Sequence, residues 1–115
     1  MNAAAPLVSR KDQLVAELTA LGPMRKGSLS EQMVRTVLKD GTPRQRGPYT
    51  VYTFKERGQT VSQRLSDPKQ IALYRRQIGA FRRFQELTAD LARLSQQLAD
   101  VEAAGEADGK KNSRR

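Results

Sequence analysis

The spacing of apolar positions changes twice along the chain, which divides it into a helical start, a β-rich middle and a long helical end. From Leu7 to Leu21 the apolar residues recur at spacings of three, four and seven, and this pattern predicts an amphipathic helix over residues 7–22. Ser9 is placed to cap its first turn, and Gly22-Pro23 ends it. A helix of this length is marginal alone, so we expect it to pack on another element.

The middle of the chain favours extended structure. Residues 31–38 are rich in β-branched side chains and are interpreted as a strand, with a helix as the alternative. Residues 39–48 contain two glycines and two prolines, a composition that predicts a loop.

A hairpin is predicted over residues 49–65, where two β-favouring runs meet at Arg57-Gly58 with Gly58 at positive φ. This turn pairs Phe54 with Val61, Tyr52 with Gln63, and Thr50 with Leu65. That face is largely apolar and is expected to pack on a helix. Strand alternation gives the opposite face to the pairs Val51 with Arg64, Thr53 with Ser62, and Lys55 with Thr60.

Helical periodicity returns at Pro68, with Ser66 or Asp67 as the expected cap, and continues to residue 104. Near Gly79 the phase of the pattern shifts, so the first half is expected to pack on the hairpin. Steps of three and four then define a heptad seam of Phe84, Leu87, Leu91, Leu94, Leu98 and Val101. We expect this seam to pair with the helix at 7–22, with a second copy of the chain, or with both.

Together these elements predict an α+β fold. Its parts are an N-terminal helix, a small three-stranded antiparallel sheet formed by hairpin 49–65 and a strand at about 31–38, and a long C-terminal helix with a coiled-coil end. One domain over residues 7–104, with its sheet over 29–65, is the expectation for a chain of 115 residues. Residues 1–6 are predicted to be disordered, and 105–115 to be a disordered basic tail.

The chain is strongly basic, with a formal net charge of +9 and a pI of about 10.5. Residues 1–93 hold 17 basic and 8 acidic side chains, so the excess does not come from the tail alone. Such a charge favours nucleic acid or an anionic membrane as a partner. No apolar run approaches the roughly 18 residues that span a bilayer, and the start lacks the order of a signal peptide. We therefore expect a cytoplasmic protein with no membrane partner.

The absence of cysteine and histidine removes disulfides, thiolate metal sites and the commonest general base. Gly27-Ser28 and Gly41-Thr42 lack the spacing and the lysine of a P-loop. The expectation is a protein that is not an enzyme, with no catalytic residue, metal or cofactor.

Basic side chains and short hydroxyls instead gather on the predicted sheet and its lead-in. A sheet face of this composition can enter a DNA groove, where Arg reads guanine edges while Lys and hydroxyls hold phosphates. The predicted binding face consists of Arg64, Lys55, Arg57, Thr53, Ser62 and Tyr49, with Arg25, Lys26, Arg44 and Arg46 gripping phosphates. Tyr49 is expected to stack on a base or sugar. The alternative is a solvated outer face, where Ser and Thr are also favoured.

Three segments carry a family resemblance: MRKGSLSEQMVR (24–35), GPYTVYTFKERGQTVSQRL (47–65) and RRQIGAFRRFQEL (75–87). Over about two-thirds of its length the chain resembles an uncharacterised bacterial domain family that is often encoded near mobile elements. Members share the GSL segment, the Gly-Pro-Tyr strand, a second strand that follows a glycine turn, and a long helix. Their loop is usually cysteine-rich, with a histidine before Gly-Pro-Tyr. Residues 36–49 have neither residue here, so the resemblance implies no metal role, and the family has no assigned activity to transfer.

A sheet followed by a helix is also similar to the arm-DNA-binding domain of phage-type integrases, which reads the major groove with its sheet. The leading hypothesis is therefore a small, nucleoid-associated nucleic-acid-binding protein, accessory to a mobile element. Duplex DNA is favoured over RNA as the partner, although the sequence does not separate the two. The alternatives are a homodimer or protein-interaction module that uses the seam Phe84–Val101, and RNA or ribosome binding.

Overall fold

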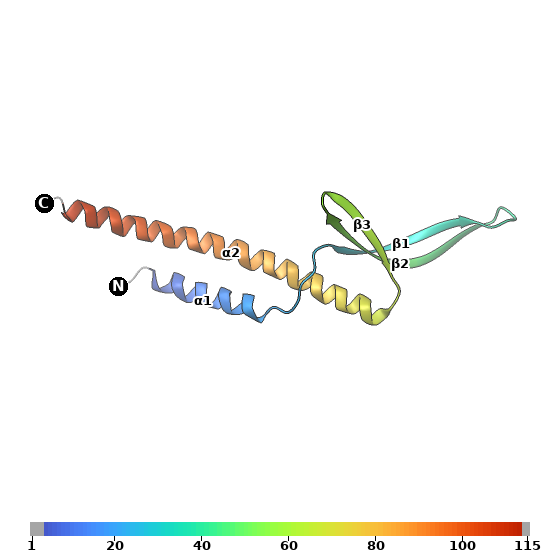
Figure 1. The fold of residues 1–115 in the computed structure, drawn as a ribbon, viewed down its shortest axis with the longest axis horizontal. Coiled ribbons are helices and arrows are strands. Elements are labelled where there is room, and N and C mark those ends of the chain that lie inside the picture. Colours follow the sequence, from blue (N-terminus) through green and yellow to red (C-terminus); the bar gives the residue numbers. More distant parts are fainter. Residues whose placement is uncertain (1–3, 114–115) are drawn as a thin grey trace. The chain divides into compact units, whose positions relative to one another are not determined.

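The structure, a computed structural model, describes residues 4–113, with side chains up to residue 106. Its elements are α1 (Ala5–Ala20), β1 (Ser28–Val37), β2 (Pro43–Glu56), β3 (Gln59–Leu65) and α2 (Pro68–Ser113) (Figure 1). The strands form one antiparallel sheet in the order β1-β2-β3. The predicted α+β fold is confirmed.

The chain, expected to form one domain over residues 7–104, divides into two compact units. The sheet unit, Gly22–Phe81, holds the three strands and the first turns of α2. The helical unit, Met1–Leu21 with Arg82–Arg115, holds α1 and the rest of α2. Each unit has its own cluster of buried apolar side chains.

The sheet unit is built on the predicted hairpin. All six predicted cross-strand pairs are present, from Phe54 opposite Val61 to Thr50 opposite Leu65. The apolar face packs on α2, as expected, in a cluster of Tyr52, Leu65, Tyr74 and Ile78 with Leu29, Phe54 and Ile71 against it. The predicted register is therefore confirmed. A slip of one residue would have exchanged the apolar and polar faces.

Tyr52 lies at the centre of this cluster and is only 3% exposed. Its ring stacks on Phe54 and meets Tyr74 edge-on, with 5.1 Å between centroids in both cases. Its hydroxyl donates a hydrogen bond to the carbonyl of Lys26. The buried phenol is therefore satisfied at its polar end, as a buried tyrosine requires.

The turn of the hairpin has both central residues in the left-handed region, with φ of 51° at Arg57 and 80° at Gly58. Two successive positive φ values match the tight turn whose twist suits antiparallel strands. The predicted positive φ of Gly58 is confirmed, and Arg57 shares it.

The predicted loop at 39–48 is wrong in its second half, because β2 begins at Pro43. Pro43 is the first residue of the strand, where a missing N–H is tolerated. Gly47 and Pro48, joined by a cis peptide bond, lie opposite Met33 where the β1–β2 register shifts. A bulge sets two residues opposite one, and neither Gly47 nor Pro48 has a partner in the ladder, so glycine and proline are accommodated there.

β1 confirms the predicted strand over the alternative helix, but starts three residues earlier than residue 31. A five-residue turn, Leu38–Thr42, joins it to β2. The N–H of Leu38 donates to the carbonyl of Thr42, and the N–H of Gly41 to the carbonyl of Leu38, both at 2.9 Å. Hydrogen bonding by Thr42, through its side chain and its backbone, lowers the pKa of the Asp40 carboxyl.

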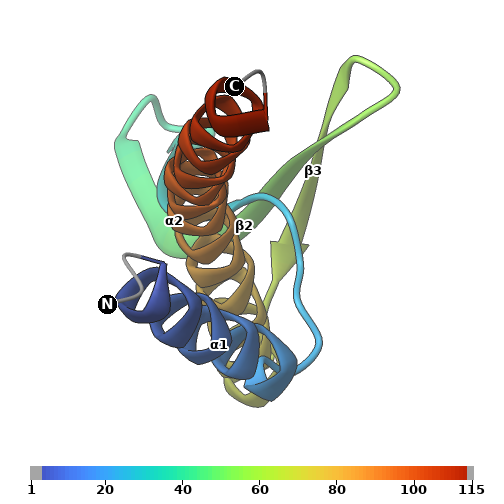
Figure 2. The same ribbon diagram turned by 90° about the vertical axis from the view of Figure 1, so that its left-hand side faces the viewer.

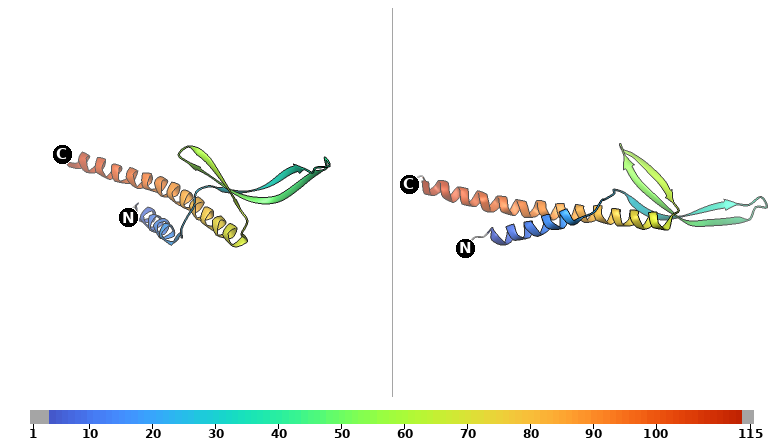
Figure 3. Two further views of the ribbon diagram at one scale, coloured as in Figure 1. Left: turned by 45° about the vertical axis from the view of Figure 1, so that its right-hand side comes forward. Right: turned by 60° about the horizontal axis from the view of Figure 1, so that its bottom comes forward.

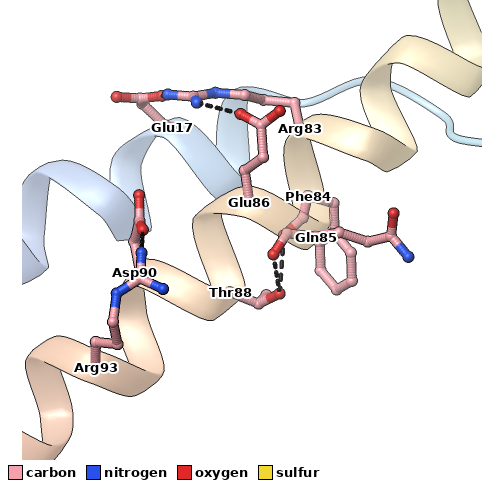
Figure 4. A network of polar contacts seen from close by, with 8 residues as sticks. All are labelled: Glu17, Arg83, Phe84, Gln85, Glu86, Thr88, Asp90 and Arg93. Carbon is pink, nitrogen blue, oxygen red and sulfur yellow. Dashed lines mark hydrogen bonds and ion pairs between the residues drawn. The ribbon is translucent and has the colours of Figure 1, made fainter.

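The helical unit confirms that the seam of α2 pairs with α1 (Figure 2). Leu14 and Leu87 are 1% and 0% exposed. They form a cluster with Leu94, against which Leu7, Leu18, Leu21 and Leu91 pack. Arg83 of α2 pairs with Glu17 of α1 at 2.6 Å and with Glu86 at 2.9 Å (Figure 4), and these carboxylates raise the pKa of Arg83.

The observed helix ends differ from the predicted ones. α1 begins at Ala5 after an Ala4 cap without a side-chain hydrogen bond, so Ser9 lies inside the helix and is not its cap. α2 continues to Ser113, beyond the predicted end at 104. The prediction of disorder is wrong for residues 5–6 and 105–113, which are helical, and residues 1–3 and 114–115 lie outside the described residues.

The predicted cap of α2 is confirmed at Asp67. Its carboxylate accepts a hydrogen bond from the N–H of Lys69 at 3.0 Å, and its carbonyl accepts one from the N–H of Ile71 at 2.9 Å. Pro68 follows directly, at a position where its missing N–H has no partner to lose.

Gly27, which precedes β1, is expected to be intolerant of any side chain. A Cβ there would lie 2.6 Å from both the carbonyl oxygen of Thr53 and Cε1 of Tyr52, at a φ of 120°. Gly27→Ala should therefore lower the free energy of unfolding by about 2–4 kcal/mol, since overpacking and backbone strain add. Urea denaturation followed by tyrosine fluorescence measures it, because all three tyrosines lie in the sheet unit.

Gly22→Ala is the matched control, because a Cβ at Gly22 meets nothing within 4 Å. It should leave the urea midpoint unchanged. Equal stability of the two variants would contradict the placement of Tyr52 against Gly27.

Candidate nucleic-acid interface

The positive charge of the chain belongs almost entirely to the sheet unit. Residues 22–81 contain twelve Lys or Arg and four Asp or Glu, whereas the remaining residues contain nine and eight. The sheet unit therefore carries a net charge of +8 out of the total of +9. A strong positive field on one compact unit attracts polyanions.

The strand register sorts these side chains onto two faces. We define the outer face as the side of the sheet opposite Tyr52. Paired residues share a face, so the outer face carries the rows Ser28–Thr53–Ser62, Ser30–Val51–Arg64, Gln32–Tyr49 and Lys55–Thr60. The register thus brings together five predicted site residues: Tyr49, Thr53, Lys55, Ser62 and Arg64.

Arg64 and Tyr49 form the centre of the outer face. The guanidinium carbon of Arg64 lies 3.8 Å from the centroid of the Tyr49 ring. Tyr49, predicted to stack on a base, stacks on this guanidinium within the chain itself. A guanidinium held flat on an aromatic ring keeps its N–H groups in its own plane, where they can donate a pair of hydrogen bonds to a phosphate or a guanine edge.

The outer face holds Val51 as predicted, but this residue is buried. Val51, which lies between Ser30 and Arg64 on the central strand, is only 8% exposed. Next to it, the hydroxyls of Thr53 and Ser62 are 3.5 Å apart. The face therefore has a buried aliphatic residue under its arginine and a hydroxyl pair beside it.

Arg44 and Arg46 continue the outer face beyond the bulge. A Cβ on Gly47 would lie 3.2 Å from the sulfur of Met33, which places Gly47 on the Met33 side of the ladder. Alternation then returns Arg46, opposite Val34, and Arg44, opposite Thr36, to the side of Tyr49. Both arginines are exposed.

Arg25 and Lys26 do not belong to the outer face. The guanidinium of Arg25 lies 4.0 Å from the ring centroid of Tyr74, and its Nε donates to Oε1 of Gln77 at 3.0 Å. The N–H of Arg25 also donates to the carbonyl of Gln77 at 3.0 Å. Lys26 is exposed and lies with its ammonium 5.7 Å from the ring centroid of Phe81. These two residues attach the lead-in segment to α2.

Arg57 is exposed at the hairpin turn, two residues beyond Lys55 on β2. Ser28, Ser30 and Gln32, which the register places on the outer face, were not among the predicted site residues. The alternation of Ser28, Leu29 and Ser30 was the available signal, because an apolar residue between two polar ones is typical of a strand with one covered face.

Within residues 4–106, no three His, Cys, Asp or Glu side chains come together as a potential metal site. In the described part of the chain, neither helix combines the length and apolarity that a membrane span requires.

Comparison of the chain with protein-family models, with curated proteins and with solved structures finds no match.

Arg25 is expected to contribute to stability, and Arg25→Ala tests this. Loss of the Tyr74 contact and the Gln77 hydrogen bond should lower the free energy of unfolding by about 1–2 kcal/mol. Urea denaturation followed by tyrosine fluorescence provides the measurement. Arg76→Ala, at an exposed position of α2, is the control and should stay within about 0.5 kcal/mol of wild type. An unchanged midpoint for Arg25→Ala would mean that its contacts with α2 do not stabilise the unit.

Proposed function

We propose that this chain is a small, non-enzymatic nucleic-acid-binding protein that holds duplex DNA against the outer face of its sheet. The observation that carries the proposal is the stacked pair of Arg64 and Tyr49 within a unit of net charge +8. An exposed arginine in a fixed plane is suited to bidentate recognition, and the surrounding charge supplies affinity.

The side chains of the outer face have two roles, contact with phosphates and recognition of a base. Lys55, Arg44 and Arg46 contact phosphates as mobile cations, and the hydroxyls of Thr53 and Ser62 donate to phosphate oxygens. Arg64 lies between them and donates to the O6 and N7 atoms of a guanine. Phosphate contacts set the position of the duplex, and this single arginine gives a modest base preference.

Two arguments favour duplex DNA over RNA. The major groove of B-form DNA, about 12 Å wide, admits β-structure, whereas the major groove of an RNA helix is deep and too narrow for side chains to read. The GSL and Gly-Pro-Tyr segments resemble a family encoded near mobile elements, where DNA is the substrate of transposition. An accessory role at a mobile element would place the protein in the cytoplasm, at the nucleoid.

A protein partner or a homodimer on the α2 seam is the competing proposal. Leu87 and Leu94 of this seam are already covered by α1. Such a partner would have to displace α1 or be confined to Leu98 and Val101, which are half-buried. The arrangement of the helical unit therefore favours the sheet unit as the functional surface.

The double variant Arg44→Gln, Arg46→Gln tests the proposal. If each arginine contacts a phosphate, the slope of log K against log salt should fall by about 2, and affinity near 0.1 M salt should fall by on the order of tenfold per residue. Fluorescence anisotropy with a labelled random duplex over a salt series provides the measurement.

The matched control is Arg10→Gln, Lys11→Gln on α1, which removes the same charge from exposed positions of the helical unit. It should leave the slope unchanged. Equal losses in both variants would mean that net charge alone, and not the outer face, determines binding. An absence of binding to duplex DNA at micromolar protein and low salt would overturn the proposal, and stronger competition by structured RNA would reassign the partner.

A further inference from the structure

The outer end of the β1–β2 ladder forms a two-stranded ribbon that nothing in the sheet unit covers. We define the ribbon as residues 33–46, from the bulge to the far turn and back. All of its residues are exposed except Thr36, which is half-buried. Figures 1 and 3 show the two strands extending beyond β3 as an arm within the sheet unit.

The ribbon combines charge with exposed apolar side chains. It carries the cations Arg35, Lys39, Arg44 and Arg46 and one carboxylate, that of Asp40. Among its apolar residues, Val37 is 71% exposed and lies opposite Pro43, and Leu38, 40% exposed, follows it at the start of the far turn. Large apolar side chains that are grouped and rimmed by charge are typical of an interaction surface.

The turn that presents these apolar residues is ordered by its own hydrogen bonds. The Leu38–Thr42 and Gly41–Leu38 backbone bonds close it, and the carboxylate of Asp40 accepts from the N–H of Thr42 at 2.9 Å. The conformation of the tip is therefore preorganised, which lowers the entropic cost of binding.

We propose that the ribbon enters the DNA minor groove and that its tip, Val37 with Leu38 and Pro43, wedges between base steps and bends the duplex. The inference rests on the proposed function, since it assigns a second contact with the same duplex. Apolar side chains inserted from the minor groove unstack a base step and kink DNA toward the major groove. From Val34 to Val37 the strand adds about 10–13 Å of reach, enough to enter a groove.

Charge decides between DNA and a second copy of the chain as the occupant. Arg44 and Arg46 follow one face of the ribbon and Arg35 the other, so phosphates on both sides of a groove can be contacted. Two copies of a ribbon with four cations and one anion would repel each other. A polyanion fits both faces, whereas a like-charged partner fits neither.

The test measures bending separately from binding. A duplex of about 30 base pairs, labelled at its two ends with a donor and an acceptor dye, reports bending as a rise in energy transfer, and anisotropy reports affinity. The variant is Val37→Thr, Leu38→Gln, which keeps side-chain size and the β-branch of residue 37 but makes the tip polar. The matched control is Val15→Thr, Leu73→Gln, the same replacements at positions 40% and 38% exposed outside the ribbon. Circular dichroism checks that both variants fold.

We expect wild type and control to raise energy transfer on binding, as a bend of roughly 20–90° would. The tip variant should lose most of this rise and bind with less than about a tenfold loss of affinity, because its cations remain. Binding by wild type without a rise would overturn the wedge and leave the proposed function standing. An unchanged rise in energy transfer for the tip variant would also overturn the wedge. So would a tip variant that loses self-association in sedimentation but still bends the duplex. No binding by any form would remove the proposed function and the wedge together.

Discussion

The burial of Tyr52 is the constraint on which the sheet unit depends. Its ring lies between Phe54, Tyr74 and Arg25, and its hydroxyl is bonded to the carbonyl of Lys26. The approach to Gly27 is so close that no other residue fits there without displacement. Because side chains of a strand alternate between faces, the inward position of Tyr52 forces Val51 and Thr53 outward. One buried phenol thus fixes which residues the sheet can present to a partner.

This constraint separates basic side chains that stabilise the fold from those that remain available. Arg25 is held against Tyr74 and Gln77, and Arg83 is held between Glu17 and Glu86 in the helical unit. Within residues 4–106, the cations of the outer face form no ion pair with a carboxylate. Arg64 lies between these two groups of side chains. Its guanidinium contacts the Tyr49 ring, but its N–H groups remain able to donate hydrogen bonds to a partner. A count of arginines in the sequence cannot make these distinctions, because they depend on which groups meet across the fold.

The sequence was most informative where short-range patterns decide the structure. The hairpin register followed from a glycine turn and from alternation. Heptad spacing located the α2 seam but left open whether α1, a second copy of the chain or both would cover it. Both signals are local and both were correct. The prediction failed at Pro43–Pro48, where proline and glycine indicated a loop although a strand start and a bulge accommodate them. The loss of Arg25 from the candidate site, and the stacking of Tyr49 on Arg64, depend on contacts between residues far apart in the sequence, which periodicity does not encode.

The central claim is that duplex DNA lies against the outer face, and amide chemical-shift mapping tests it most directly. The uniformly labelled chain is titrated with a short duplex, and the shifts of residues on the two faces of the sheet are compared. The account predicts the largest changes at Tyr49, Thr53, Ser62 and Arg64 and along residues 33–46, with small changes for Leu14 and Leu87. Changes concentrated in α1 and the seam of α2, with the outer face unaffected, would contradict it.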